Sequence, residues 1–172
     1  MVIPDTNMWA QGSISDPWWG TQHRSLDYIN EPFNNLDSVA RWRELGYTQT
    51  KFTGDMYDMR QPEPVWIAGF REMFPLRYFS WSVYRMTPGC ALPEHGDTYA
   101  FFKKKHRLAE DTTIVRIIVF LEEWQSGHYL EMNKRPVIKW DKGDWVCWGN
   151  QFLHLAANVG QTNRYTLQIT GI

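Results

Sequence analysis

The 172 residues carry 18 lysines and arginines against 19 aspartates and glutamates, so the formal net charge is -1. This length suits one domain with a real hydrophobic core, and the charge balance offers no overall field that would attract nucleic acid or an anionic membrane. Two cysteines, Cys90 and Cys147, are too few for a disulfide scaffold. We expect both to be reduced, partly buried core residues, which fits a cytoplasmic setting.

No targeting or membrane segment is predicted. The first seven residues lack a basic region followed by an apolar one, so no secretory signal is expected. The longest apolar run, 114–121, contains an arginine and is far shorter than the ~20 residues of a membrane helix. We expect one domain, 1–172, with an irregular and helical N-terminal part at 1–78 and a β-rich core at 79–172.

The N-terminal part shows little periodicity. Residues 1–34 are rich in Pro, Asn, Asp and Trp, which indicates an irregular segment held against the domain by aromatic side chains: Trp9, Trp18, Trp19 and Phe33. A short helix is predicted from Asp37, as N-cap, to Gly46. The apolar spacing predicts a second helix at 63–74. Both helices are expected to pack outside a sheet.

From Pro75 onward, short alternating segments separated by turn residues predict strands. We expect eight, at 77–86, 91–100, 113–121, 128–132, 136–140, 145–148, 152–158 and 164–170. Eight strands suit a double-sheet jelly roll, so the predicted fold is mainly β. The exception is 101–112, with the basic run Lys103–Arg107, which the sequence allows to be either a solvated loop or a mobile basic lid that attracts an acidic substrate.

Three residues form a candidate metal site. His95 and Asp97 are two apart, so both side chains point to one face of an extended segment. His154 lies in a later apolar run and supplies a second imidazole. Two imidazoles and one carboxylate describe the open-sided site of non-haem iron(II). Zinc could use the same ligands, but an open-sided set with an anion-binding arginine nearby favours iron(II).

The parity of the strands places more polar residues near this site. In the last strand Arg164 and Thr166 share a face with Gln168 and Thr170, while Tyr165, Leu167 and Ile169 lie on the other. Arg116 stands in an apolar strand, where a charge is costly unless it faces a polar cavity or an anion. It therefore either contacts a substrate or cosubstrate carboxylate or lies at a surface edge.

The order His-x-Asp at 95–97, His154 and then Arg164 resembles that of the iron(II)- and 2-oxoglutarate-dependent oxygenases, most of all the prolyl-hydroxylase-like branch. The resemblance covers 79–172 and implies a double-stranded β-helix, a jelly roll also seen in cupins. It also implies iron(II) bound by His95, Asp97 and His154. The cosubstrate 2-oxoglutarate would then chelate the iron, with its distal carboxylate on Arg164.

The resemblance suggests two further contacts to 2-oxoglutarate. Thr166 resembles the second member of an Arg-x-Ser/Thr pair that completes the carboxylate clamp in some relatives. Tyr84 resembles a tyrosine that reaches the cosubstrate in prolyl hydroxylases. The family's nucleic-acid demethylases carry a second arginine six residues after the first, but position 170 is Thr here. A nucleic-acid substrate is therefore not expected.

Together these features predict a dioxygenase that uses iron(II), 2-oxoglutarate and O2 to hydroxylate an amino-acid, peptide or protein side chain. The alternative is a cupin-like metal-binding or ligand-binding module without redox turnover, since a fold does not fix a function. Arg164 separates the two readings, because a simple cupin would not need an arginine at that spacing.

Overall fold

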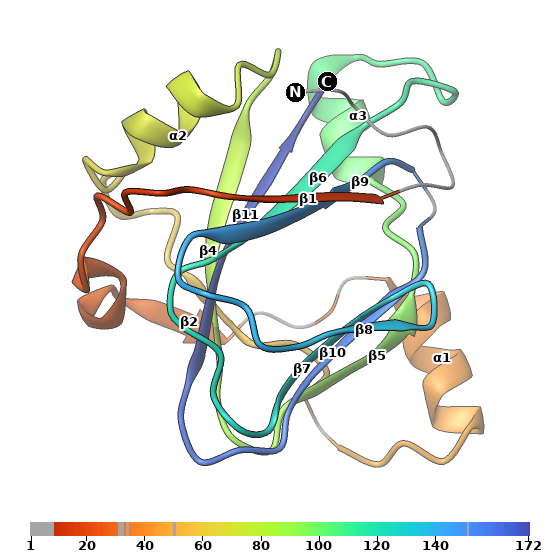
Figure 1. Cartoon of the computed structure of the whole chain (residues 1–172). Coiled ribbons are helices and arrows are strands. Elements are labelled where there is room, and N and C mark those ends of the chain that lie inside the picture. Colours follow the sequence, from red (N-terminus) through yellow and green to blue (C-terminus); the bar gives the residue numbers. More distant parts are fainter. Residues whose placement is uncertain (1–8, 31–32, 34, 50, 151) are drawn as a thin grey trace.

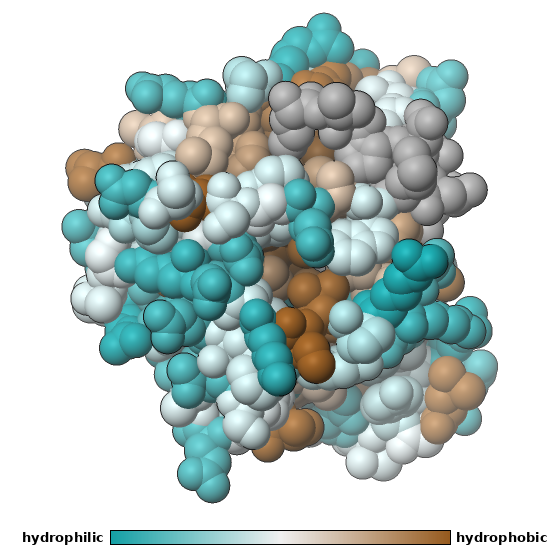
Figure 2. Space-filling view, viewed as in Figure 1, coloured by the Kyte–Doolittle hydropathy of each residue, from teal (hydrophilic) through white to brown (hydrophobic). Residues whose placement is uncertain are grey.

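The computed structural model describes residues 9–30, 33, 35–49, 51–150 and 152–172, so the expectation for the first seven residues lies outside the described part. Two antiparallel sheets face each other in a mainly β, double-stranded β-helix architecture (Figure 1). Hydrophobic side chains gather near the centre of an otherwise mostly hydrophilic face (Figure 2). None of the helices described is long and apolar enough to cross a lipid bilayer.

The larger sheet has seven strands, and the smaller sheet has four. In spatial order the large sheet contains β1 (Trp9–Ser13), β9 (Asp144–Trp148), β6 (Val115–Phe120), β11 (Arg164–Gly171), β4 (Ser80–Met86), β3 (Asp55–Tyr57) and β2 (Tyr28–Asn30). The small sheet contains β5 (Ala91–His95), β10 (His154–Asn158), β7 (His128–Met132) and β8 (Arg135–Val137). Strand β8 is largely exposed and forms one edge of its sheet.

The alternation along β11 divides the core into two layers. Leu167 and Ile169 point to the outer face of the large sheet, where they join a cluster that includes Trp19 and Phe70. Helix α2 (Ile67–Met73) contributes Phe70 to this layer. The inner layer lies between the sheets and is built from residues such as Met86, Ile118, Phe120, Leu130, Met132 and Trp148. The inner face of β11 therefore looks into the space between the sheets.

Both predicted helices are present, with different starts. Helix α1 (Leu36–Glu44) follows Asn35, whose side chain accepts a hydrogen bond from the Ser38 amide, so Asn35 rather than Asp37 is the N-cap. Helix α2 begins four residues later than predicted, because Pro64 disfavours a helical conformation at the preceding residue and the chain turns before Ile67.

All eight predicted strands are present, most of them shorter than expected. Tyr78 has a positive φ of 57°, so β4 cannot start at Arg77, and Lys139, with a φ of 59°, lies beyond the end of β8. Strand β5 ends at His95, which leaves Asp97 in the following loop. Strand β10 begins at His154 rather than at residue 152.

The prediction of an irregular and helical N-terminal part was only partly correct, because strands β1, β2 and β3 lie within residues 1–78. Strand β1 pairs with β9 in register from Trp9 opposite Trp148 to Ser13 opposite Asp144. Strands β2 and β3 extend the other side of the sheet. The first third of the chain thus supplies both outer edges of the large sheet.

The expected loop at 101–112 was also wrong in its first half. Helix α3 (Ala100–His106) carries the basic run, and its Phe102 is buried against Tyr99 and Ile114. A helix forms here because this aromatic anchor fixes one face while the lysines remain on the others.

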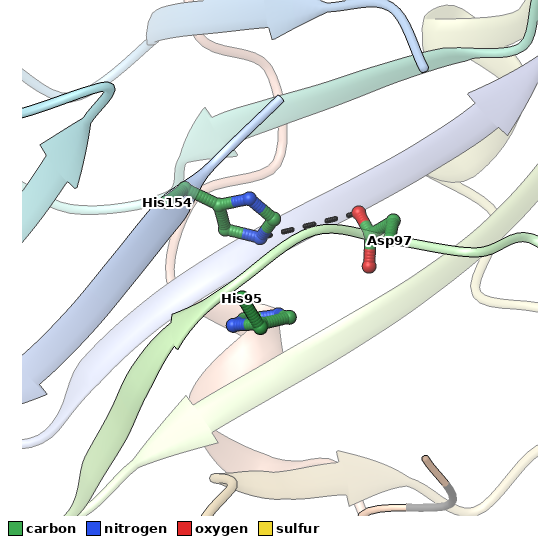
Figure 3. Close-up of side chains that lie close together, drawn as sticks. All are labelled: His95, Asp97 and His154. Carbon is green, nitrogen blue, oxygen red and sulfur yellow. Dashed lines mark ion pairs between the residues drawn. The ribbon is translucent and has the colours of Figure 1, made fainter. Parts of the chain in front are cut away.

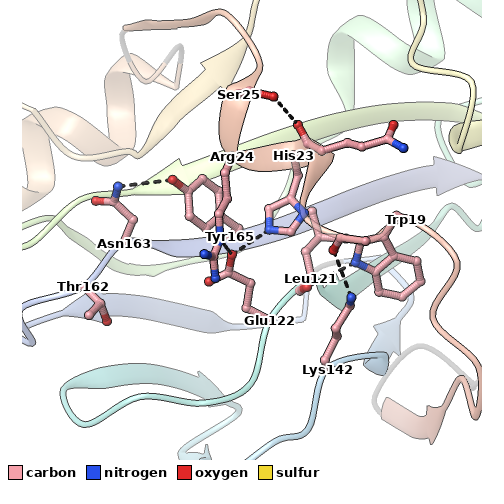
Figure 4. A network of polar contacts seen from close by, with 12 residues as sticks. Trp19, His23, Arg24, Ser25, Leu121, Glu122, Lys142, Thr162, Asn163 and Tyr165 are labelled. Carbon is pink, nitrogen blue, oxygen red and sulfur yellow. Dashed lines mark hydrogen bonds and ion pairs between the residues drawn. The ribbon is translucent and has the colours of Figure 1, made fainter.

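A polar network ties the N-terminal segment to the strands (Figure 4). The Trp19 indole donates to the Leu121 carbonyl at 3.1 Å, and the His23 imidazole donates to the Glu122 carboxylate at 2.7 Å. Arg24 forms an ion pair with the same carboxylate. Burial alone would raise the pKa of Glu122, but the hydrogen bonds from His23 and Arg24 hold it below its usual value. Cys90 and Cys147 are both free, as predicted.

Candidate metal centre

The structure brings His95, Asp97 and His154 together at one end of the small sheet (Figure 3). His95 is the last residue of β5 and lies directly opposite His154, the first residue of β10. Asp97 reaches the same point from the loop after β5. One ligand atom from each residue lies within 4.8 Å of the others. The three residues therefore form a compact cluster that can hold one metal ion.

Each imidazole is oriented by a backbone carbonyl. Nδ1 of His95 hydrogen-bonds to the Pro93 carbonyl at 2.8 Å, and Nδ1 of His154 hydrogen-bonds to the Phe152 carbonyl at 3.0 Å. A proton on Nδ1 leaves each Nε2 as a lone-pair donor, which is how imidazoles are usually prepared for metal binding. Burial, and then the neighbouring His154, lowers the pKa of His95 to about 4, and burial also lowers the pKa of His154. Both rings are neutral ligands near pH 7.

Arg116 is the cationic partner of the carboxylate in this cluster. Its Nε donates to Oδ2 of Asp97 at 3.3 Å, and its Nη1 donates to the Gln168 side chain at 3.0 Å. Burial would raise the pKa of Asp97, but the charge of Arg116 and the two histidines hold it at about 2. The edge position considered for Arg116 is wrong, because β6 lies between β9 and β11.

A cavity of about 220 Å³ extends from the metal cluster between the two sheets. Arg164 lines it and is only 5% exposed. Its Nη1 donates to the Tyr129 carbonyl at 2.7 Å, while its Nε has no partner among the described residues. Burial lowers the pKa of Arg164 to about 10, and no described carboxylate forms an ion pair with it. A buried guanidinium of this kind is a ready binding group for an anion.

The other predicted cosubstrate contacts line the same cavity. Thr166 and Tyr84 are opposite each other in the pairing of β11 with β4. Ala156 of β10, in the small sheet, lines the same cavity. Sequence reasoning missed Trp148, which is 1% exposed and also lines the cavity. Its indole N–H has no acceptor among the described residues. Only its position in an alternating strand could have suggested that it points inward.

A second, wider groove of about 1030 Å³ opens beside the cavity. Four residues line both hollows: Phe33, Tyr84, Asp97 and Arg116. The rest of the groove wall is rich in aromatic and methionine side chains, which come from β3, β4, α3 and the loops beside them: Met56, Met59, Trp81, Tyr99, Phe101 and Phe102. The metal cluster thus lies where an inner cavity and an outer groove meet, an arrangement with room for two different ligands.

The donor set fits a divalent transition metal. Two neutral imidazoles and one ionised carboxylate leave positions free on an octahedral ion, as non-haem iron(II) sites require. The carbonyl contacts that fix the rings and the arginine that holds the carboxylate are the supporting interactions expected around such ligands.

Comparisons with known proteins agree on the fold. No family model matches the chain, and no curated protein matches its sequence. A prolyl-4-hydroxylase from Pseudomonas putida has a similar structure, with a TM-score of 0.57, 14% identity, and coverage of 96% of this chain and 93% of that chain. The viral collagen prolyl hydroxylase vCPH from Paramecium bursaria Chlorella virus-1, in a 2OG complex, gives a TM-score of 0.52 at 13% identity, with coverage of 85% and 96%.

These likenesses, with the geometry above, define a class: a double-stranded β-helix protein that shares the fold of prolyl hydroxylases. A candidate His-Asp-His metal centre lies at the mouth of its internal cavity. At 13–14% identity, the solved structures are similar to this chain in fold, and the function rests on its own residues.

Proposed function

We propose that the protein is an iron(II)- and 2-oxoglutarate-dependent dioxygenase that hydroxylates an amino-acid, peptide or protein side chain. The observation that carries this proposal is the buried Arg164, which has no carboxylate partner among the described residues and shares a cavity with the His-Asp-His cluster. A metal site alone would not need this cation, whereas a cosubstrate with a distal carboxylate does.

In this proposal His95, Asp97 and His154 hold the iron, which with 2-oxoglutarate activates O2 for hydroxylation. The backbone bonds to both Nδ1 atoms keep the Nε2 lone pairs aimed at the ion. Arg164 binds the distal carboxylate of 2-oxoglutarate with its planar fork of donors. Thr166 and Tyr84 supply hydroxyl groups to the same molecule.

The apolar part of the cavity excludes water from the cosubstrate. Leu130 and Trp148 are fully or almost fully buried, and Ala156 leaves space beside the ligand histidine. A low-dielectric surrounding strengthens the pairing between Arg164 and a carboxylate. The apolar walls therefore strengthen the hold of Arg164 on a cosubstrate whose other end is bound to the metal.

The test is calorimetry under anaerobic conditions with iron(II) and then 2-oxoglutarate, on the wild type and on Asp97→Ala. We expect both ligands to bind the wild type, and Asp97→Ala to lose most iron affinity because it lacks the one anionic ligand. Iron binding that is unchanged in Asp97→Ala would refute the metal assignment.

Failure of the wild type to bind 2-oxoglutarate would favour the cupin-like module instead. That module could bind a metal with the same three ligands but would have no use for a buried arginine in the cavity. Formation of succinate from 2-oxoglutarate in air is the second readout, since a binding module without redox turnover would produce none.

A further inference from the structure

Arg116 is a second cation at the site, and the proposed function leaves it without a counter-ion of its own. Its Nε binds Asp97 at 3.3 Å, and Asp97 is the only described carboxylate with which it forms an ion pair. Once Asp97 binds the metal, its negative charge is shared with a divalent cation. Arg116 then keeps its hydrogen bond but loses most of its electrostatic compensation.

The charges of the loaded site do not cancel. The divalent metal, Arg116 and Arg164 together carry four positive charges, whereas 2-oxoglutarate and Asp97 carry three negative ones, so the loaded site keeps one net positive charge. Arg116 is the cation whose only carboxylate partner among the described residues also binds the metal. Among the described residues that line the groove, the only other charged ones are Asp37 and Lys105, which offset each other. The Arg116 side chain is only 18% exposed, so water compensates this charge poorly.

Arg116 is placed away from the proposed anchor of 2-oxoglutarate. It lies opposite Thr170 in the pairing of β6 with β11, six residues along β11 from Arg164. Six residues of a strand span about 20 Å of backbone. Arg116 therefore stands at the other end of the site and faces the outer groove as well as the cavity.

The wall of the groove is largely apolar, so it suits a ligand with an apolar body. Its wall contains Phe33, Leu36, Met56, Met59, Trp81, Tyr99, Phe101 and Phe102. Three of these side chains remain unusually open to solvent: Leu36 at 75%, Met59 at 46% and Phe101 at 76%. Exposed apolar residues that surround a hollow indicate a ligand that covers them.

We propose that the primary substrate is an organic acid with an apolar body, whose carboxylate pairs with Arg116 while the body lies in the groove. This inference rests on the proposed function and narrows its substrate class to molecules that present a free carboxylate. The Arg116 guanidinium has five N–H groups, and its bonds to Asp97 and Gln168 use two of them. Lys105 of α3, at the groove wall, adds a positive field that favours entry of an anion.

The test compares an acid with its uncharged amide on the protein loaded with manganese(II) and 2-oxoglutarate, which avoids turnover. The probes are 4-phenylbutyrate and 4-phenylbutyramide, which share one apolar body. Trp81 and Trp148 line the two hollows, so tryptophan fluorescence can report binding. We expect the acid to bind about 10- to 150-fold more tightly than the amide, the ratio that one charge-assisted hydrogen bond supplies.

The variants then assign this preference to one side chain. Arg116→Gln should abolish it and leave the dissociation constant of 2-oxoglutarate within about threefold of wild type, while Arg116→Lys, which keeps the charge, should restore part of it. Because Arg116 also holds Asp97, manganese affinity should fall by about 10- to 100-fold in Arg116→Gln, so the acid and the amide are compared at saturating manganese. Lys105→Gln is the matched control. The preference for the acid should persist in this variant, because Lys105 attracts the anion from a distance and does not bind its carboxylate.

Equal binding of acid and amide, binding of neither, or a preference that persists in Arg116→Gln would overturn the inference. So would a large loss of 2-oxoglutarate affinity in Arg116→Gln at saturating manganese, which would place Arg116 in the cosubstrate site. A wild type that binds neither manganese nor 2-oxoglutarate would instead defeat the proposed function itself.

Discussion

The buried guanidinium of Arg164 should make cosubstrate binding separable from metal binding. Arg164→Lys keeps a positive charge but loses the planar two-pronged match to a carboxylate and is shorter. We expect the dissociation constant of 2-oxoglutarate to rise about 10- to 150-fold, equivalent to roughly 1.5 to 3 kcal/mol, in calorimetry. Iron affinity measured without 2-oxoglutarate should stay near the wild-type value, and a joint loss would instead identify Arg164 as a residue needed for folding.

The low pKa values of the proposed metal ligands predict an unusual pH dependence. His95, with a pKa of about 4, and Asp97, at about 2, remain ready to bind metal well below neutral pH. Manganese affinity should therefore change by less than about threefold between pH 7.5 and pH 5.5, because two ordinary histidines with a pKa of about 6.5 would lose about a hundredfold by protonation. A steep loss in calorimetry over this range would show that the imidazoles titrate normally.

Alternation along the strands was sufficient to predict that His95, His154 and Arg164 face one site, because it fixes which face of a strand a residue occupies. Asp97 was expected in the same strand as His95, whereas it reaches the site from the loop after β5. The partner of Arg116 could not be predicted in this way. Asp97 is 19 residues away and meets Arg116 from a loop, whose course depends on packing rather than on a repeat. The inward position of Trp148 follows from pairing between strands that are distant in the sequence.

At the scale of elements, Phe102 is the one buried side chain of α3. Phe102 is 8% exposed and packs on Tyr99 and Ile114, whereas Phe101 is 76% exposed. Phe102→Ala should free the basic helix and speed tryptic cleavage at Lys104, Lys105 or Arg107 by at least about tenfold, since proteolysis follows local opening. Phe101→Ala is the matched control and should be cut at the wild-type rate. Equal cleavage of both variants would show that α3 is not anchored through Phe102.

The network around Glu122 links the N-terminal segment to the end of β6, and it should stabilise the protein in a pH-dependent way. The pKa of Glu122 is lowered in the folded protein, so its contribution is complete above the unfolded value of about 4.3 and is lost as the pH falls through the lower folded value. Glu122→Gln should reduce the free energy of unfolding by about 1 to 3 kcal/mol at pH 7 in urea denaturation. Exposed Glu123→Gln should have little effect, and an equal loss there would refute the role of the network.

The elements that sequence analysis missed are those whose pattern is too short or too polar. Strands β2 and β3 have three residues each, which is less than two periods of alternation. Strand β1 contains Gly12, and glycine is unfavourable in the interior of a strand. Here it allows the Trp145 ring to pack closely against the backbone. In α3 the run of three lysines hid the one aromatic residue that turns it into a packed helix.

For the whole molecule, we expect one cooperative unit rather than a core with a separable N-terminal part. Trp19 is fully buried in the outer core layer with residues from α2, β4, β6 and β11. Trp19→Ala should therefore lower the free energy of unfolding by about 3 to 5 kcal/mol while the protein still unfolds in a single transition. Two resolved transitions in calorimetry would show that the first 78 residues fold apart from the remainder.

Strand β8 has a consequence for how the protein behaves at high concentration. It occupies one edge of the small sheet, is three residues long, and exposes Arg135 and Pro136 to solvent. Proline donates no amide hydrogen, and a charged side chain resists burial, so this edge is a poor template for a strand from another molecule. The sheet that carries His95 and His154 is thereby guarded against edge-to-edge aggregation at its β8 edge, which lies across the sheet from β5.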